Sequence, residues 1–265
     1  MLIAVASVKG SPGATSLALG LAALWPARDA VLVEADPEGG DLAARFGHCP
    51  QPGLASLAAS ARAGVATQPL RWHTQHLAVG ADAVLAPPGD GAAASVQTLA
   101  YSARQLSADP GAGTVVCDLG RLTHGGPAAP IAAAADHLLL VVRPTLEDLA
   151  QFDARLAWLR SGAATTGRLW VVLAGRGGYT ATDVALAWGV KVAGELPRDG
   201  WGAGVLCGRL WSRGWRRLRL SRAICGIAAS LTAAGAAKAP GLLSTPSVAA
   251  SAAAGSATAG VVKTP

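Results

Sequence analysis

The chain has 265 residues, of which 51 % are hydrophobic and only 14 % are charged, and its formal net charge is +6. This length suits one α/β domain with a tail; two small domains would also fit, but one is the simpler interpretation. The net charge permits attraction to nucleic acid or anionic lipid and implies neither. No pair of its four cysteines has metal-ligand spacing, so we expect reduced and mostly buried thiols. The apolar runs are too short or too interrupted to span a bilayer, which predicts a cytoplasmic protein, with peripheral contact at the inner membrane face as the open alternative.

Short runs rich in Val, Leu and Ile recur along the chain, with helical or loop material between them. Their continuous apolarity, without polar alternation, is typical of strands covered on both faces, as in a parallel sheet. We therefore predict an α/β fold, a doubly wound and mostly parallel sheet flanked by helices, over residues 1–235. The expected strands are 2–8, 30–35, 114–118, 137–143 and 168–174, with weaker candidates at 77–81 and 190–196. The expected helices are 16–24, 54–63, 92–106, 146–159 and 181–188.

The last 30 residues differ in composition from the rest of the chain. Residues 236–265 are mainly Ala, Ser, Thr, Pro and Gly, with almost no large side chains. Such a segment cannot bury enough apolar surface to offset the entropy lost on ordering, so we expect a disordered tail.

A glycine-containing loop follows the first expected strand and leads into the first expected helix. A loop at this position can bind an anion, because its glycines let backbone amides turn inward and the helix start carries unpaired N–H groups. A hydroxyl from its last two residues can reach a magnesium ion. The ordinary phosphate loop has a lysine where this chain has alanine. The candidate nucleotide-binding residues are Lys9, Gly10, Ser11, Pro12, Gly13, Ala14, Thr15 and Ser16.

This loop resembles the deviant phosphate loop of the ParA/MinD family, Lys-Gly-Gly-x-Gly-Lys-Thr-Thr or Ser. Lys9 matches the early signature lysine, which in the family reaches the nucleotide of the partner subunit across a dimer. Residues 31–41 resemble the switch I strand and loop, with Glu34 in place of the first aspartate and Asp36 as the second. Residues 115–120 resemble the strand that ends in the switch II aspartate, here Asp118. Segments 138–145 and 190–199 also match in order, so the resemblance covers about residues 1–231.

The resemblance implies a P-loop domain that binds ATP and Mg²⁺. It places Lys9 and Asp36 in catalytic roles and Thr15, Asp36 and Asp118 at the metal. Each acidic residue has a structural alternative, because Asp is common at strand ends, turns and helix caps. We interpret Asp41 as such a cap.

The alanine at position 14 bears on activity. A lysine–phosphate contact is a charge-assisted hydrogen bond of about 1.5–3 kcal/mol, so its loss weakens binding by roughly ten- to a hundredfold. Hydrolysis suffers more, because phosphoryl transfer depends on electrostatic stabilisation. We therefore expect either a slow ATPase or a pseudo-ATPase.

The leading hypothesis is an ATP-binding protein for spatial positioning or partitioning of pilus or secretion machinery, septum or chromosome. It would act through nucleotide-responsive dimerisation, and its partners would be a second copy of itself and proteins of the positioning system. The alternative is a pseudo-ATPase scaffold that binds partner proteins without nucleotide turnover. The atypical loop is similar to those of CpaE/TadZ-like proteins and of actinobacterial MinD-like proteins.

Two further segments leave alternatives open. The asparagine that holds adenine in the family is absent, because Arg176 follows Ala174 and Gly175; this arginine would either stack on a base or be solvated. The segment from Arg209 to Arg222 carries six arginines. We expect it to end in a packed helix with solvated arginines, and contact with lipid or DNA is the alternative.

Overall fold

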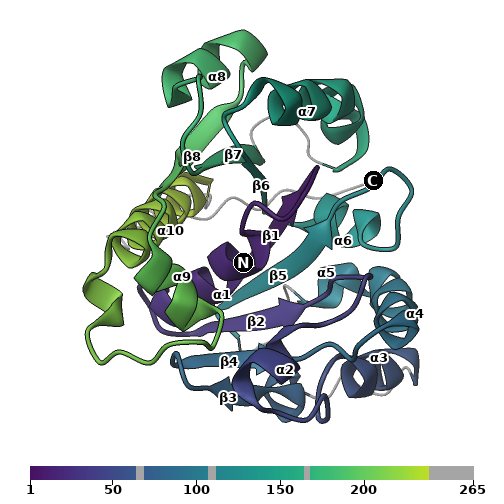
Figure 1. Cartoon of the computed structure of the whole chain (residues 1–265). Helices are drawn as coiled ribbons and strands as arrows, with labels where there is room; N and C mark the ends of the chain where they lie inside the picture. The colour runs from purple at the N-terminus through teal and green to yellow at the C-terminus, as the bar shows by residue number, and fades with distance from the viewer. Residues whose placement is uncertain (64–68, 107–111, 164–167, 239–265) are drawn as a thin grey trace, which may run out of the picture.

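The computed structural model describes residues 1–63, 69–106, 112–163 and 168–238. Within these ranges the chain forms one sheet of eight strands in the order β3-β4-β2-β5-β1-β6-β7-β8 (Figure 1). Every neighbouring pair is parallel except the edge pair of β3 and β4, which is antiparallel. The predicted doubly wound, mostly parallel sheet is therefore confirmed.

Helices and strands alternate along most of the chain. The strands are β1 (Leu2–Ser7), β2 (Ala30–Glu34), β3 (Gln75–Leu77), β4 (Ala81–Val84), β5 (Thr114–Arg121), β6 (His137–Val142), β7 (Leu169–Ala174) and β8 (Lys191–Leu196). The α-helices are α1 (Ala14–Leu24), α2 (Leu42–Phe46), α3 (Leu54–Arg62), α4 (Asp90–Ala100), α5 (Ala103–Leu106), α6 (Ala129–Ala134), α7 (Leu146–Trp158), α8 (Ala181–Trp188), α9 (Gly200–Leu206) and α10 (Arg219–Lys238). Short 3₁₀ turns, η1 (Leu70–His73) and η3 (Trp215–Arg217), and one π turn, η2 (Leu159–Ala163), complete the set.

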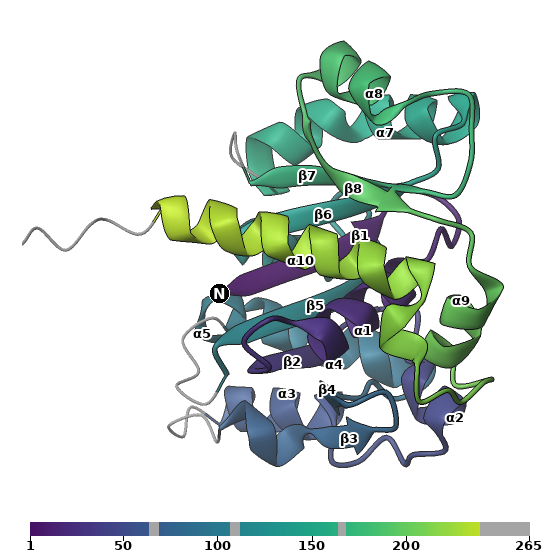
Figure 2. The same cartoon turned by 90° about the vertical axis from the view of Figure 1, so that its left-hand side faces the viewer.

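The sheet has a hydrophobic core on each face, which explains the continuous apolar runs. Along β1, Leu2 and Ala4 pack into one core and Ile3 and Val5 into the other, since successive side chains of a strand point to opposite faces. The first core is closed by side chains of α3, α4, α6 and α7, and the second by side chains of α1, α9 and α10. Figure 2 shows α10 running across the second face beside α1.

The final helix docks on the sheet as expected. Leu220, Ile224, Ile227 and Leu231 of α10 are at most 6 % exposed, whereas the arginines of its first turn face solvent. Helix α1 approaches closely at Gly20, where a Cβ would lie 2.5 Å from the Ile224 side chain. Among the described residues, no helix combines the length and continuous apolarity needed to cross a membrane.

Several sequence predictions need correction. The predicted strand 77–81 is wrong, because a turn at Gly80 (φ 82°) joins the short strands β3 and β4 there. The predicted helix 92–106 is interrupted after Ala100. Cys117 is the one buried cysteine among four. Helix α10 extends to Lys238, past the predicted start of the tail at 236, and the remainder of the predicted tail, 239–265, lies outside the described residues.

Candidate functional site

The predicted phosphate loop joins β1 to α1 at the carboxyl edge of the sheet. Gly10 and Gly13 have φ values of 64° and 105°, in the left-handed region that favours glycine. Gly13 is the N-cap of α1, and no side chain bonds to the first amides of the helix there. These amides also lack intrahelical acceptors, so the loop presents donors to an anion.

The alanine in the lysine position is a core residue. Ala14 begins α1, is 7 % exposed and packs into the core on the α1 face of the sheet. Its methyl group has no charge or hydrogen-bonding atom to offer the loop. The loop backbone can therefore bind an anion, but the lysine that ordinary phosphate loops have at the start of the helix is absent.

Two acidic residues meet beside this loop. Glu34 ends β2 and pairs in register with Asp118 of β5, and both are 1 % exposed. The Gly120 amide donates to Asp118 Oδ1 at 3.2 Å, whereas Oδ2 has no hydrogen-bond partner within the described chain. The pKa of Asp118 is raised to about 7, mainly by burial; the Thr15 hydroxyl and the Gly120 amide oppose this rise, and the charges of Glu34 and Asp36 contribute to it.

This arrangement fits a magnesium site. A buried carboxylate oxygen without a partner, next to the Thr15 hydroxyl, is suited to a cation or to a water bound by one. Among the described residues, no three His, Cys, Asp or Glu side chains are grouped so as to hold an ion by themselves. An ion here would therefore take most of its ligands from phosphate oxygens and water, as Mg²⁺ usually does.

Asp36 lies at the edge of the same acidic group. It is half-buried, and its Oδ1 accepts a hydrogen bond of 2.9 Å from the Glu38 amide. Burial raises the pKa of Asp36, and its charge in turn raises that of Asp118. Its carboxylate lies against Gly120, where a Cβ would collide with it. The structure thus brings Thr15, Asp36 and Asp118 together beside the loop.

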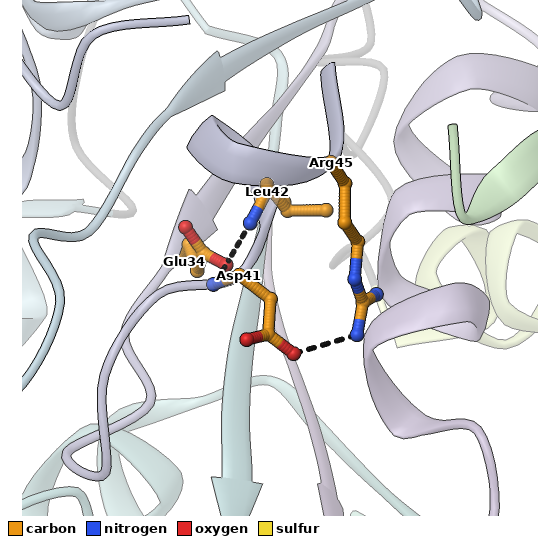
Figure 3. Close-up of polar contacts among 4 residues, drawn as sticks. All are labelled: Glu34, Asp41, Leu42 and Arg45. Atoms are coloured by element: carbon orange, nitrogen blue, oxygen red, sulfur yellow. Dashed lines mark hydrogen bonds and ion pairs between the residues drawn. The ribbon is translucent and has the colours of Figure 1, made fainter. Parts of the chain in front are cut away.

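Glu34 has a structural role. Its Oε1 accepts hydrogen bonds from the Asp41 and Leu42 amides at 2.8 and 3.0 Å (Figure 3). Its Oε2 accepts one from the Ala86 amide at 2.9 Å. Burial raises the pKa of Glu34, and these bonds oppose the rise. Glu34 therefore caps α2 from the neighbouring strand and fastens it to the end of β4.

The predicted capping role of Asp41 is only half right. Asp41 occupies the N-cap position of α2, but its side chain makes no capping bond. It pairs instead with Arg45 one turn later, at 2.6 Å (Figure 3). A helix start needs an acceptor, and here the buried Glu34 has taken that position.

Lys9 stands exposed at the start of the loop. It lies near the first turn of α7, where hydrogen bonds within the turn lower the pKa of Glu147 and the charge of Lys9 lowers it further. Its side chain is therefore on the surface of the protein, and its own loop does not enclose it.

An arginine that the sequence analysis passed over lies beside the loop. Arg143 follows β6 directly, and its Nη1 lies 3.5 Å from the position that a Cβ on Gly10 would take. Arg143 lines a cavity of about 300 Å³ together with Ser11, Gly13 and Ser16. Sheet order is the signal that could have found it, because neighbouring parallel strands such as β1 and β6 end at one edge.

The cavity leads away from the loop toward the ends of β7 and β8. There it shares Gly175, Leu196, Pro197 and Arg198 with a second cavity of about 580 Å³. Arginine side chains dominate that second wall. They are Arg176, Arg198, Arg219 and Arg222, with Glu195 as the acidic member.

Comparison with known proteins gives a result at the level of structure. No protein-family model matches the chain, and no curated protein matches it in sequence. A ParA family ATPase from Chlorobium tepidum superposes with a TM-score of 0.68 at 18 % identity, covering 87 % of this chain and 98 % of the other. The cell division ATPase MinD of Pyrococcus furiosus gives a TM-score of 0.68 at 16 % identity, covering 88 % and 98 %. This chain has the ParA/MinD fold.

A third structure contains ligands. MinD of Pyrococcus horikoshii, in complex with Mg-ADP, superposes with a TM-score of 0.65 at 13 % identity and covers 87 % of this chain and 95 % of its own. The structural neighbours are thus ATPases of the ParA/MinD family, and the fold of the present chain is that of P-loop nucleotide-binding proteins.

Proposed function

We propose that this protein binds ATP with Mg²⁺ at the loop from Lys9 to Ser16 and uses the bound state to control dimerisation in a positioning or partitioning system. The observation that carries this proposal is Asp118 Oδ2, a buried oxygen without a partner beside Thr15. Leaving such an atom unpaired costs free energy, and a magnesium-bound water would satisfy it. The Mg-ADP complex of the structural neighbour supports the same ligand chemistry.

In the proposed complex, each part of the site has its own task. The amides from Gly10 to Ser16 hold phosphate oxygens, while Thr15 and Asp118 hold the ion and its water. Asp36 orients water at the edge of the acidic group. Mg²⁺, when bound, neutralises phosphate charge. Lys9 is exposed and would reach a nucleotide held by a second copy, which would couple occupancy to a homodimer.

Turnover is proposed to be slow or absent, because Ala14 offers no charge to the phosphates as negative charge builds up during transfer. The second candidate is a pseudo-ATPase scaffold that binds partner proteins without turnover. The burial of Ala14 in the core favours this candidate, since the position serves packing in this chain. A relationship to CpaE/TadZ-like or actinobacterial MinD-like proteins, with pilus or secretion partners, belongs to the same proposal.

One titration separates these candidates. Purified protein is titrated with ATP in the presence of Mg²⁺ while nucleotide occupancy, dimer mass and phosphate release are followed. We expect occupancy and dimer formation with little release. Absence of binding at millimolar ATP would exclude the nucleotide-responsive function and leave the scaffold. The matched control is Asp118→Ala, which should lower the Mg²⁺ dependence of binding.

Contact with an anionic surface is a second proposed property, at α9 and the segment that joins it to α10. Trp201 and Trp211 are 65 % and 71 % exposed, and Arg213 lies over the Trp211 ring at 5.8 Å. Exposed tryptophan beside arginine suits a lipid headgroup layer, so we propose a cytoplasmic protein with peripheral contact at the inner membrane face. Vesicles with and without anionic lipid test this, with Trp211→Ser as the variant. Binding to duplex DNA in place of vesicles would assign the surface to nucleic acid.

A further inference from the structure

We infer that Arg143 supplies the cationic contact to the β- and γ-phosphates that Ala14 cannot make. This inference rests on the proposed function, because it concerns how the same loop holds a nucleotide. In ordinary phosphate loops the lysine of the helix start reaches these phosphates. In this chain the charge would come from the neighbouring strand instead of the helix.

The sheet register brings the two segments together. Ser7, the last residue of β1, pairs with Val141 of β6, so two further residues carry β6 to Arg143 beside the beginning of the loop. The result is the 3.5 Å approach of Nη1 to the Cβ position of Gly10. Arg143 and the loop residues Ser11, Gly13 and Ser16 line one cavity, so a phosphate held by the loop amides lies on the side that Arg143 faces.

Within the part of the chain that the structure describes, the guanidinium of Arg143 makes no ion pair. The salt bridges within the described chain join Arg45 to Asp41 and His76 to Asp82, both away from this cavity. Lys9, the other cation of the loop, has the carboxylate of Glu147 nearby. Arg143 therefore brings to the loop cavity a positive charge that no ion pair of the described chain neutralises.

The chemistry of arginine suits this position. Its planar guanidinium presents several donors that match phosphate oxygens in pairs, and it remains charged at any physiological pH. The residue after it is the buried Pro144, which restricts the backbone of Arg143 to extended conformations. Arg176 lines only the second cavity, and Arg198 lies at the wall that the two cavities share, with its Nε 3.4 Å from the position that a Cβ on Gly175 would take.

A charge-relocation experiment tests the inference. Mg-ATP, Mg-ADP and AMP are titrated into the wild type, Arg143→Ala, Ala14→Lys and the double variant Ala14→Lys with Arg143→Ala. We expect Arg143→Ala to weaken ATP and ADP binding about ten- to a hundredfold. AMP binding should change less than about twofold, because AMP has no β- or γ-phosphate. The double variant should recover at least about tenfold of the lost affinity, because lysine then returns to the helix start.

Two controls keep the result interpretable. Arg176→Ala removes an arginine of the second cavity and should leave the preference for ATP over AMP unchanged. Since Arg143 is exposed, its alanine variant should unfold at the wild-type temperature, which excludes misfolding as the cause of weaker binding.

The outcomes separate the two proposals. If the wild type binds ATP and Arg143→Ala binds it equally well, the inference is wrong while the proposed function stands. The same conclusion follows if Ala14→Lys improves ATP affinity by the same factor in the wild type and in Arg143→Ala. Two residues that share one role should have non-additive effects on affinity. If the wild type binds no nucleotide, the proposed function fails and the inference fails with it.

Discussion

Replacing Asp118 by asparagine should make the apoprotein more stable at neutral pH. The change keeps the shape of the side chain and removes its charge. In the folded protein, burial raises the pKa of Asp118 from 3.8 to about 7. A group with a raised pKa contributes stability that is fully present below its unfolded pKa and is lost as pH rises through its folded pKa. The free energy of unfolding of the wild type should therefore fall between about pH 4 and pH 7. The variant has no ionisable group at position 118, so it should not show this fall.

The magnitude follows from the two pKa values. At about 1.4 kcal/mol for each pKa unit, a rise from 3.8 to about 7 corresponds to about 4 kcal/mol. Urea unfolding at pH 4 to 8 without divalent cations measures the gap between the variant and the wild type, which we expect to widen by up to about 4 kcal/mol toward pH 8. Asp90→Asn, at an exposed position on α4, is the matched control.

A gap that stays constant within about 1 kcal/mol across this range would refute the reasoning, because burial would then not be suppressing the ionisation of Asp118. Mg-ATP provides a check in the opposite direction. If the carboxylate serves a magnesium site, the ligand should stabilise the wild type more than Asp118→Asn.

The other predictions concern packing and the buried polar groups. Glu34→Ala removes the acceptor of three backbone amides and should cost about 3 kcal/mol of unfolding free energy by urea titration; a loss below about 1 kcal/mol would contradict the capping role. Gly20→Ala places a methyl group 2.5 Å from a side chain of α10 and should destabilise by about 1–3 kcal/mol, whereas Gly226→Ala meets nothing within 4 Å and should stabilise by up to about 1 kcal/mol. Burial raises the pKa of Cys117 to about 12, so at pH 8 iodoacetamide should modify the exposed Cys49 and leave Cys117 unmodified in the native protein, as mass spectrometry of peptides would show.

The sequence predicts the long buried strands well, for a physical reason. β1, β6 and β7 are covered on both faces, so their residues other than His137 are apolar or small, and that pattern is visible in a single chain. The edge hairpin of β3 and β4 is short and carries a turn in the middle of its apolar residues, so periodicity misplaces it. The presence of a buried strand can thus be predicted from its own residues, whereas the position of the hairpin depends on the turn at Gly80.

The candidate site divides in the same way. The loop glycines stand between a strand and a helix, where local order reveals them. Asp118 follows the apolar run of its strand, although β5 continues past it to Arg121. The partners of Glu34 do not, because its hydrogen bonds to Leu42 and Ala86 join residues 8 and 52 positions away. Arg143 was missed because its place depends on β6 lying next to β1, a fact of sheet order.

The bonds of Glu34 also have a mechanical consequence. They fasten the end of β2, the start of the short helix α2 and the end of β4 to one another, so both ends of the turn that carries Asp36 are held. At the other end of α2, the carbonyl of Arg45 lies so close to Gly208 that a Cβ would collide with it. Gly208 begins the segment that exposes Trp211. A displacement of α2 would thus meet the backbone at Gly208, and this five-residue helix links the anchored acidic turn to the segment that carries Trp211.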